Sequence, residues 1–520
     1  MSIRTFAAID VGSFEVSMKI VEFTGKNFSE KNRSRVLEHV RRRISLGNDT
    51  YNKGKISNEK MDELCRTLKE FADIMKMYRV DEYKAYGTSA IRETENTSIV
   101  LDQIALRTGI NIEFLSNSEQ RFLDYKAIAF SGEIFNNIIR EGTAIVDIGG
   151  GSIQISLFDK DMLIATQNLK LGVLRIQSDL GRINVTGDRF ENLVDEMAMA
   201  QLGTFKKLYL KDYVIKNLIV VDDYLSVYLS RKIRENGRTP LVSLKEYEEF
   251  LGMLRAGSVP EIAGKLNVSE DYAMLTIISS LLVKNIMNLM NAQNIWAPGV
   301  SLCDGIAYEY AEKHRLLSCD HDFERDIIAC AKNISKRYMG SRKRGETLEN
   351  IALTIFDNMK KIHGLGSRER LYLRLAAFLH DCGKYISMAD MGETSYHIIM
   401  ATEIIGLSHA EREIVANVVR FNHTPFIYYR DMRAQNTKLS KDAYLIVAKL
   451  TAILRVANGL DRSHKEKLKE IRAKLKENTL VLTVDSQVDI SLEKGLFEDR
   501  AAFFREVFSI KPIIKQRKQL

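Results

Sequence analysis

Two segments of the chain combine an aspartate, glycine and serine in an order suited to phosphate chemistry. Asp10 ends one apolar run and is followed by Gly12 and Ser13. Asp147 ends a second apolar run and is followed closely by three glycines and Ser152. Successive N–H groups in such a turn can surround an anion, because glycine lets the backbone approach it closely. A carboxylate at the mouth of the turn can hold a hydrated Mg²⁺ beside the bound phosphate.

Each segment is expected to form a β-hairpin with the glycines at its tip. Apolar side chains alternate after both turns, over residues 16–20 and 153–157, as they do in strands. The two aspartates are 137 positions apart (147 minus 10), which suggests a duplicated domain closing on one phosphate from both sides. For one segment alone, an ordinary hairpin with a flexible turn is an equal alternative. The predicted phosphate-binding residues of the turns are Gly12, Ser13, Gly149, Gly150, Gly151 and Ser152.

Arg92 adds a guanidinium that could bind phosphate oxygens in a bidentate manner. It lies four residues after Thr88, past a strand expected over residues 81–90. An alternative reading makes Arg92 one half of a surface ion pair with Glu93 or Glu95.

The two hairpins resemble the phosphate loops of the superfamily that contains actin, the sugar kinases and the heat-shock chaperone ATPases. The segments between them narrow this resemblance. Residues 86–96 (YGTSAIRETEN) and 116–123 (SNSEQRFL) resemble the TSA-x-R-x-A-x-N and SG-x-EEA-x-L signatures of the exopolyphosphatase and guanosine pentaphosphate phosphohydrolase (Ppx/GppA) family. The resemblance covers roughly residues 4–310 well and continues more loosely to the C-terminus.

The resemblance implies roles for the residues in these signatures. Glu119 would be the general base that orients and deprotonates the attacking water. From the residues alone, Glu119 could instead be a carboxylate that favours a helix N-terminus. The signatures also add Thr88 and Ser89 to the phosphate site. The implied catalytic residues are Glu119, Asp147 and Arg92, and the implied Mg²⁺ ligands are Asp10, Asp147 and Glu119.

The chain departs from the family pattern around the expected site. Phe14 stands where the family has Asn, and Asn117 replaces a Gly. Glu119 is followed by Gln120 and Arg121 rather than by Glu-Ala.

A second departure follows the strand that is expected to end near Val221. A glycine-rich turn, which faces the nucleotide in actin-like ATPases, is replaced by Asp222, Asp223 and Tyr224. Two carboxylates there are expected to repel a nucleotide phosphate, which argues against an ATP-dependent kinase.

The expected fold class is α/β, because strands and helices alternate after each hairpin, and the resemblance implies two actin-like domains with a central cleft. Helices dominate from about residue 316, and residues 376–383 and 448–464 resemble segments of HD-type helical domains. The predicted division is an actin-like (ribonuclease H-like) domain I over 1–125, an actin-like domain II over 126–312, an all-α HD-like domain over 313–465 and a small α+β cap over 466–520.

The HD resemblance rests on the adjacent pair His380 and Asp381. The other ligand positions of a metal-dependent HD site are altered, so we expect a structural pair that binds no metal. Those positions hold Thr347, Thr394 with His397 nearby, Asn422 with His423 beside it, and Asn458.

Composition limits the remaining possibilities. The 520 residues are 45% apolar and 28% charged, as in soluble globular proteins of several domains. No apolar run approaches 18 residues, so we expect no membrane span. The five cysteines show no CxxC spacing, which predicts reduced thiols. With no signal-peptide pattern at the N-terminus, a cytoplasmic location is expected.

The net charge of +8 weakly favours anionic partners. Basic residues gather in three stretches, over 31–43, 336–344 and 511–518, which a polyanion would find attractive. No motif for nucleic acid accompanies them, so nucleic acid is not an expected partner.

These observations predict a Mg²⁺-dependent exopolyphosphatase that releases orthophosphate from inorganic polyphosphate, with guanosine pentaphosphate (pppGpp) as a possible second substrate. A weakly active or inactive protein that senses polyphosphate or an alarmone is the alternative. An acetate-kinase-like phosphotransferase is a third reading. The family resemblance alone suggests a homodimer.

Overall fold

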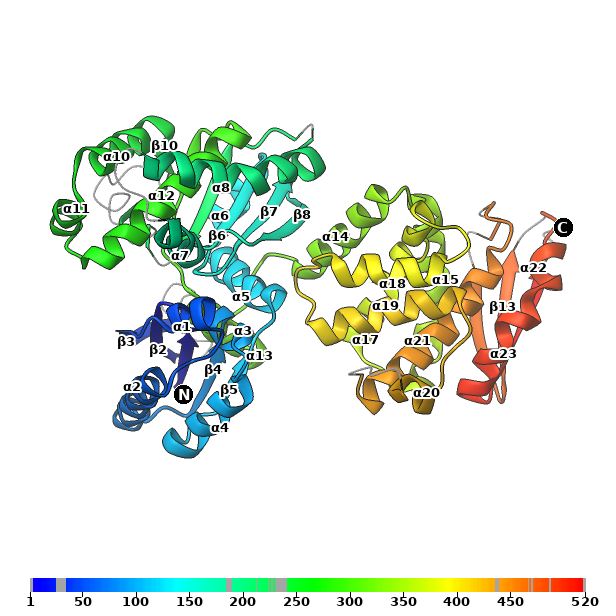
Figure 1. The fold of residues 1–520 in the computed structure, drawn as a ribbon. Coiled ribbons are helices and arrows are strands. Elements are labelled where there is room, and N and C mark those ends of the chain that lie inside the picture. The colour runs from blue at the N-terminus through cyan, green and yellow to red at the C-terminus, as the bar shows by residue number, and fades with distance from the viewer. Residues whose placement is uncertain are drawn as a thin grey trace. The chain divides into compact units, whose positions relative to one another are not determined.

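The chain forms two compact units, residues 1–322 and 323–520 (Figure 1). In this computed structural model, the described residues are 3–24, 34–183, 189–211, 213–222, 224–225, 228–229, 241–434, 439–465, 467–468, 471–485 and 488–517.

The first half of unit 1, which we name lobe I, is built on a five-stranded sheet of order β3-β2-β1-β4-β5. Strand β1 pairs antiparallel with β2 and parallel with β4. The strands are β1 (Arg4–Val11), β2 (Glu15–Phe23), β3 (Ser34–Arg43), β4 (Glu82–Gly87) and β5 (Ile112–Phe114), and the helices between them are α1 (Leu46–Lys53), α2 (Asn58–Met77), α3 (Ser89–Glu93) and α4 (Thr97–Thr108).

The second half of unit 1, lobe II, is built on a six-stranded sheet of order β10-β11-β9-β6-β7-β8. Helices α5 (Asn117–Ala129) and α6 (Glu133–Ile138) lead into it. Its strands are β6 (Thr143–Ile148), β7 (Ile153–Asp159), β8 (Met162–Leu169), β9 (Asn217–Asp222), β10 (Leu241–Ser243) and β11 (Asn294–Trp296). Its other helices are α7 (Val173–Ile183), α8 (Arg189–Phe205), the π-helical η2 (Lys206–Leu210), α10 (Leu244–Ala256), α11 (Val259–Leu266) and α12 (Glu270–Met290).

The two sheets share one topology. The order β3-β2-β1-β4-β5 in lobe I corresponds to β8-β7-β6-β9-β11 in lobe II. In both, an antiparallel hairpin is followed by a parallel strand beside its first member. The predicted α/β class and the two hairpins are therefore confirmed, and the shared topology is what the suggested duplication would produce.

Both faces of the lobe I sheet are covered, because alternate residues of β1 point to opposite sides. Ala7 and Ile9 pack with α2 and α4, whereas Phe6 and Ala8 pack with α13 (Leu302–Lys313). The chain therefore returns from lobe II to lobe I before unit 1 ends, although the sequence assigned residues up to 312 to the second domain.

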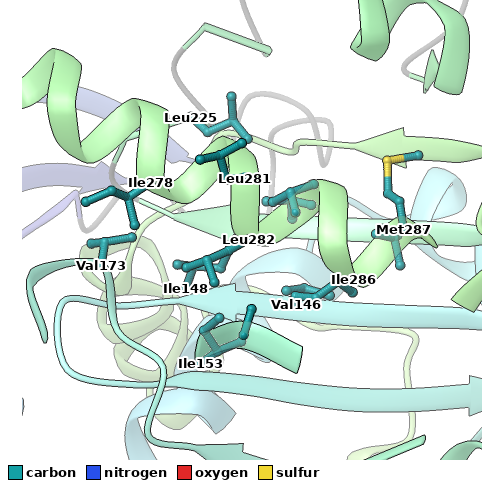
Figure 2. Close-up of a cluster of buried hydrophobic side chains, with 14 of the residues drawn as sticks. Val146, Ile148, Ile153, Val173, Leu225, Ile278, Leu281, Leu282, Ile286 and Met287 are labelled. Atoms are coloured by element: carbon teal, nitrogen blue, oxygen red, sulfur yellow. The ribbon is translucent and has the colours of Figure 1, made fainter. Parts of the chain in front are cut away.

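The core of lobe II forms where α12 lies across β6 and β7. Val146, Ile148 and Ile153 of the sheet meet Leu282 and the residues around it on α12 (Figure 2). Almost the whole circumference of α12 is buried, so its apolar composition serves the core.

Two helices are long and apolar enough to cross a membrane by length and composition. They are α12 and, in unit 2, α21 (Lys441–Leu460), whose apolar windows are 78% and 72% buried. A sequence scan for uninterrupted apolar runs did not single them out, and such burial is typical of the core helices of globular proteins.

Unit 2 is a set of helices followed by a three-stranded sheet of order β12-β13-β14. The helices are α14 (Phe323–Arg337), α15 (Arg342–Asn358), α16 (Lys360–His363), α17 (Ser367–Leu379), η3 (Cys382–Tyr385), α18 (Met391–Ala401), α19 (His409–His423), α20 (Tyr429–Ala434) and α21. The sheet contains β12 (Ile471–Lys476), β13 (Thr479–Asp485) and β14 (Lys511–Arg517), with α22 (Ser491–Gly495) and α23 (Phe497–Phe508) between β13 and β14.

We predict that Leu282→Ala lowers the free energy of unfolding of unit 1 by about 2–5 kcal/mol, because it leaves a cavity in the lobe II core. Leu106→Ala is the matched control, because Leu106 is 75% exposed on α4 and its truncation is expected to change stability by less than about 0.5 kcal/mol. Urea unfolding followed by the fluorescence of Trp296, the single tryptophan of the chain, reports on this unit. Equal effects of the two substitutions would contradict the packing described here.

Candidate active site

The two glycine turns close their hairpins in the same way. The Gly12 N–H donates to the Glu15 carbonyl over 3.0 Å, and the Gly149 N–H donates to the Ser152 carbonyl over 2.9 Å. These two amides therefore hold the turns together instead of pointing to a ligand as predicted. The amides of the turns that remain candidates for phosphate binding are those of Ser13, Gly150, Gly151 and Ser152.

Three hydroxyl groups of lobe I meet close to the glycine turn of lobe II. Ser13 Oγ lies 2.9 Å from both Tyr51 OH and Ser89 Oγ, and Tyr51 OH lies 2.8 Å from Ser89 Oγ. Burial raises the pKa of the Tyr51 hydroxyl, so Tyr51 stays protonated and can donate. We name Ser13, Tyr51 and Ser89 the hydroxyl triangle.

The glycine turn of lobe II lies directly against this triangle. A methyl group at Gly151 would be 2.7 Å from the Tyr51 hydroxyl, and one at Gly150 would be 3.1 Å from Ser13 Cβ. The structure thus brings the predicted residues Ser13, Ser89, Gly150 and Gly151 together. Tyr51 was missed, because it lies on α1, where the sequence carries no motif. Thr88, which was also predicted here, is buried one residue earlier and its N–H donates to the Val11 carbonyl.

Gly172 and the start of α7 hold the lobe II turn in place. The Val173 N–H donates to the Gly149 carbonyl over 3.1 Å, and the Leu174 N–H donates to the Gly150 carbonyl over 3.0 Å. A methyl group at Gly172 would lie 2.1 Å from the Gly150 carbonyl oxygen. Only a glycine allows the two backbone segments to approach this closely.

Asp147 forms a buried ion pair with Arg121. The Arg121 Nη1 donates to Asp147 Oδ1, and the two side chains are 5% and 9% exposed. Asp124, one helical turn along α5, is buried beside them. Burial and the neighbouring charge of Asp147 raise its pKa well above the ordinary value. The sequence marked Arg121 as a departure from the family, but nothing in it indicated its partner.

Glu119 is held at the start of α5. Its Oε2 accepts hydrogen bonds from the Ser116 N–H and hydroxyl over 3.0 and 2.6 Å, and the Glu119 N–H donates to Ser116 Oγ. This reciprocal arrangement is a capping box, so the helix N-terminal role that the sequence left open is present.

The predicted Mg²⁺ ligands Asp10, Asp147 and Glu119 do not fit one metal site in this arrangement. Arg121 already neutralises Asp147, and Glu119 caps a helix. Across the described residues, no group of three His, Cys, Asp or Glu side chains is arranged to hold a metal ion.

Arg92 contacts the segment before α5, and its binding of phosphate stays a prediction. Its Nη1 donates to the Leu115 carbonyl over 2.6 Å, and its Nη2 donates to Asn117 Oδ1. Glu93 and Glu95 pair instead with Arg175 and Lys55. The guanidinium ties α3 to the segment before α5, and the departure at Asn117 supplies one of its acceptors.

Two other departures from the family pattern meet between the lobes. The ring of Phe14 is 5% exposed and lies 5.7 and 6.0 Å from those of Tyr224 and Tyr272. Nearby, Arg43 of β3 forms an ion pair with Asp271 of lobe II. Aromatic packing and this ion pair therefore connect the two lobes at this point.

The carboxylate of Asp222, which was expected to repel a nucleotide phosphate, is turned inward. Oδ1 accepts the Leu225 N–H over 2.9 Å, and Oδ2 accepts the Ser279 hydroxyl of α12 over 2.5 Å. The side chain thus closes the turn after β9. Asp223 lies outside the described residues.

His380 and Asp381 belong to a buried polar network in unit 2. The His380 Nδ1 lies 2.9 Å from the Ala377 carbonyl, and His423 Nε2 lies 2.7 Å from the His380 carbonyl. Arg344 donates to Asn458 Oδ1 over 2.9 Å and lies 3.4 Å from Asp461 Oδ2. An arginine and amides therefore occupy the surroundings of the pair, which accords with the predicted structural role.

The basic stretches are partly engaged within the fold. Arg42 and Arg43 form ion pairs with Glu70 and Asp271, and Arg344 is buried. Lys31, Arg33 and Lys518 lie outside the described residues. All five cysteines are free thiols, as predicted.

Comparison with known proteins identifies the class. The Ppx/GppA phosphatase family matches residues 28–314, and domain III of the same family matches residues 328–501. The chain belongs to the Ppx/GppA phosphatase family, whose members are phosphoanhydride hydrolases.

Individual relatives are distant but cover nearly the whole chain. A guanosine-5'-triphosphate,3'-diphosphate pyrophosphatase of Photobacterium profundum is 20% identical over 500 residues, 92% of this chain and 91% of the relative. The corresponding protein of Vibrio atlanticus is 22% identical over 490 residues, 93% of this chain and 92% of the relative. The crystal structure of an exopolyphosphatase from Cytophaga hutchinsonii covers 61% of this chain and 100% of its own, with a TM-score of 0.52 at 21% identity, which shows a shared fold.

We predict that Gly172→Ala destabilises unit 1 by about 3 kcal/mol, because the added methyl group clashes with backbone atoms that cannot rotate away. Gly181→Ala on α7 is the control, since nothing lies within 4 Å of a methyl group there. In a helix this change is expected to stabilise by about 0.5–1 kcal/mol. Urea unfolding followed by Trp296 fluorescence measures both. Stabilisation by Gly172→Ala would contradict the close approach to Gly150.

Unit 2 is predicted to lose stability as the pH falls from 6.5 toward 4. Burial and nearby arginines lower the pKa of His423 from 6.5 to about 4, and burial lowers that of His380 well below 6.5. Between these pH values the unfolded chain binds more protons than the folded one, so acid favours unfolding. Burial raises the pKa of Asp381, which contributes with the opposite sign.

Thermal unfolding followed by far-UV circular dichroism over this pH range tests the prediction. Trp296 fluorescence serves as the control, because it reports on unit 1 alone. His423→Asn should reduce the pH dependence, whereas the exposed His397→Asn should leave it intact. A melting temperature from circular dichroism that stays the same between pH 6.5 and 4 would contradict the predicted loss of stability.

Proposed function

We propose that this protein hydrolyses terminal phosphoanhydride bonds of inorganic polyphosphate and releases orthophosphate. The observation that carries the proposal is the contact between the hydroxyl triangle of lobe I and the glycine turn of lobe II. Donors from both halves of a duplicated fold converge at this point, which suits the binding of one terminal phosphate group. Phosphoryl transfer needs mainly such positioning and charge stabilisation from a protein.

Each group at the site has a proposed task. The hydroxyls of Ser13, Tyr51 and Ser89 exchange their mutual hydrogen bonds for bonds to phosphate oxygens, and the amides of Gly150 and Gly151 support them. Glu119 uses Oε2 for its helix cap, and Oε1 would orient the attacking water and accept its proton.

Guanosine pentaphosphate is the second candidate substrate. The relatives that span nearly the whole chain are named as guanosine-5'-triphosphate,3'-diphosphate pyrophosphatases. Domain III of the family also matches residues 328–501 of this chain. Both substrates end in a phosphoanhydride, so one terminal-phosphate site serves either. Rates of orthophosphate release from each, measured separately and in competition, decide between them.

Binding without turnover remains the alternative that the departures at the site favour. Arg121 pairs with Asp147, and Phe14 packs against Tyr224 between the lobes. Polyphosphate that binds tightly without orthophosphate release would establish this sensor role.

Glu119→Gln is predicted to reduce orthophosphate release by about 10²–10⁴-fold, because an amide cannot accept the proton of water. The variant should remain as stable as the wild type, since Gln also completes a capping box. Glu246→Gln, in the capping box formed with Ser243 on α10, is the matched control and should retain full activity. Retained activity in Glu119→Gln would reduce Glu119 to a capping residue.

A further inference from the structure

Arg121 lies at the centre of the lobe II turn, although the proposed reaction gives it no task. Its Nη1 donates to Asp147 Oδ1, and its Nη2 donates to the Ser152 carbonyl over 3.4 Å. A methyl group at Gly149 would lie 3.1 Å from the same Nη2. The guanidinium therefore bridges the residues that enter and leave the glycine turn.

Asp147 needs a positive partner because its side chain is only 9% exposed. A carboxylate removed from water is strongly unfavourable unless a charge or several donors compensate it. A guanidinium remains charged at every accessible pH and cannot leave, since it is part of the chain. A divalent cation that used Oδ1 of Asp147 would have to displace it.

The position of Arg121 in the sequence supports the same conclusion. The signature that this segment resembles has alanine where this chain has Arg121. An alanine on the same face of α5 would leave the space beside Asp147 open. In this chain the guanidinium fills that space, with Asp124 buried next to it.

We propose that Arg121 is the resident cation of this site and takes the place at Asp147 that a divalent metal ion would otherwise hold. The site then binds and processes a terminal phosphate without a metal ion on Asp147. The statement about phosphate depends on the proposed function, whereas the statement about the cation does not.

The experiment is a Mg²⁺ titration of the full-length chain without substrate, followed by thermal unfolding through Trp296 fluorescence. A ligand that binds the folded state raises the melting temperature, Tm, with its concentration. Wild type is expected to show the same Tm in EDTA and in millimolar Mg²⁺. Arg121→Ala should begin with a lower Tm, which Mg²⁺ raises by several degrees because Asp147 has become available.

Two further variants show whether a Mg²⁺-dependent rise in Tm comes from this site. Asp147→Asn in the Arg121→Ala background should abolish the rise in Tm. Arg255→Ala, which removes an arginine paired with Glu191 in unit 1, should show no Mg²⁺-dependent rise. Arg121→Met, which keeps an apolar stem of similar length, replaces Arg121→Ala if the latter does not fold.

Two outcomes overturn the proposal. One is a rise in the wild-type Tm with Mg²⁺ that Asp147→Asn removes. The other is a folded Arg121 variant whose Tm does not respond to Mg²⁺. Orthophosphate release from polyphosphate in EDTA is measured in parallel. Its complete absence under all conditions would refute the proposed function, while the Tm measurements would still decide the role of Arg121.

Discussion

A buried carboxylate beside a backbone turn is the constraint on which this site depends. Asp147 lies one residue before the end of β6, where the parallel pairing with β9 and the hairpin to β7 fix its position. Because Asp147 is buried away from water, its charge must be balanced by another side chain, and Arg121 of α5 does so. The ion pair also holds the turn, because the same guanidinium reaches the Ser152 carbonyl. Arg121 therefore both neutralises Asp147 and stabilises the glycine turn.

The duplicated topology explains why donors from distant parts of the sequence converge. Each sheet places an aspartate at the end of its first hairpin strand and a glycine turn directly after it. The hydroxyls of Ser13 and Ser89 then face the turn around Gly151, with Tyr51 between them. Close backbone packing at Gly172 fixes the second turn.

Local signals allowed the sequence to predict much of this arrangement. Glycine at a turn and alternating apolar residues are properties of neighbouring residues, so both hairpins and the place of Ser13 in a turn could be predicted, whereas Ser89 was added through the family resemblance. The partners of Arg92 and Asp222 could not, because acceptors and donors brought near by tertiary packing decide where such side chains point. Arg121 illustrates the limit, since the sequence marked it as unusual and only the fold supplied Asp147 as its partner.

The aromatic contact of Phe14 with Tyr224 and Tyr272 has an energetic consequence. Separating the lobes would expose a phenylalanine ring whose burial is worth about 1.5–3 kcal/mol, and would break the pair between Arg43 and Asp271 at the same time. Separation of the lobes at this point would therefore cost the free energy of both contacts at once. A ligand that enters between the lobes would have to offset this free energy in order to bind.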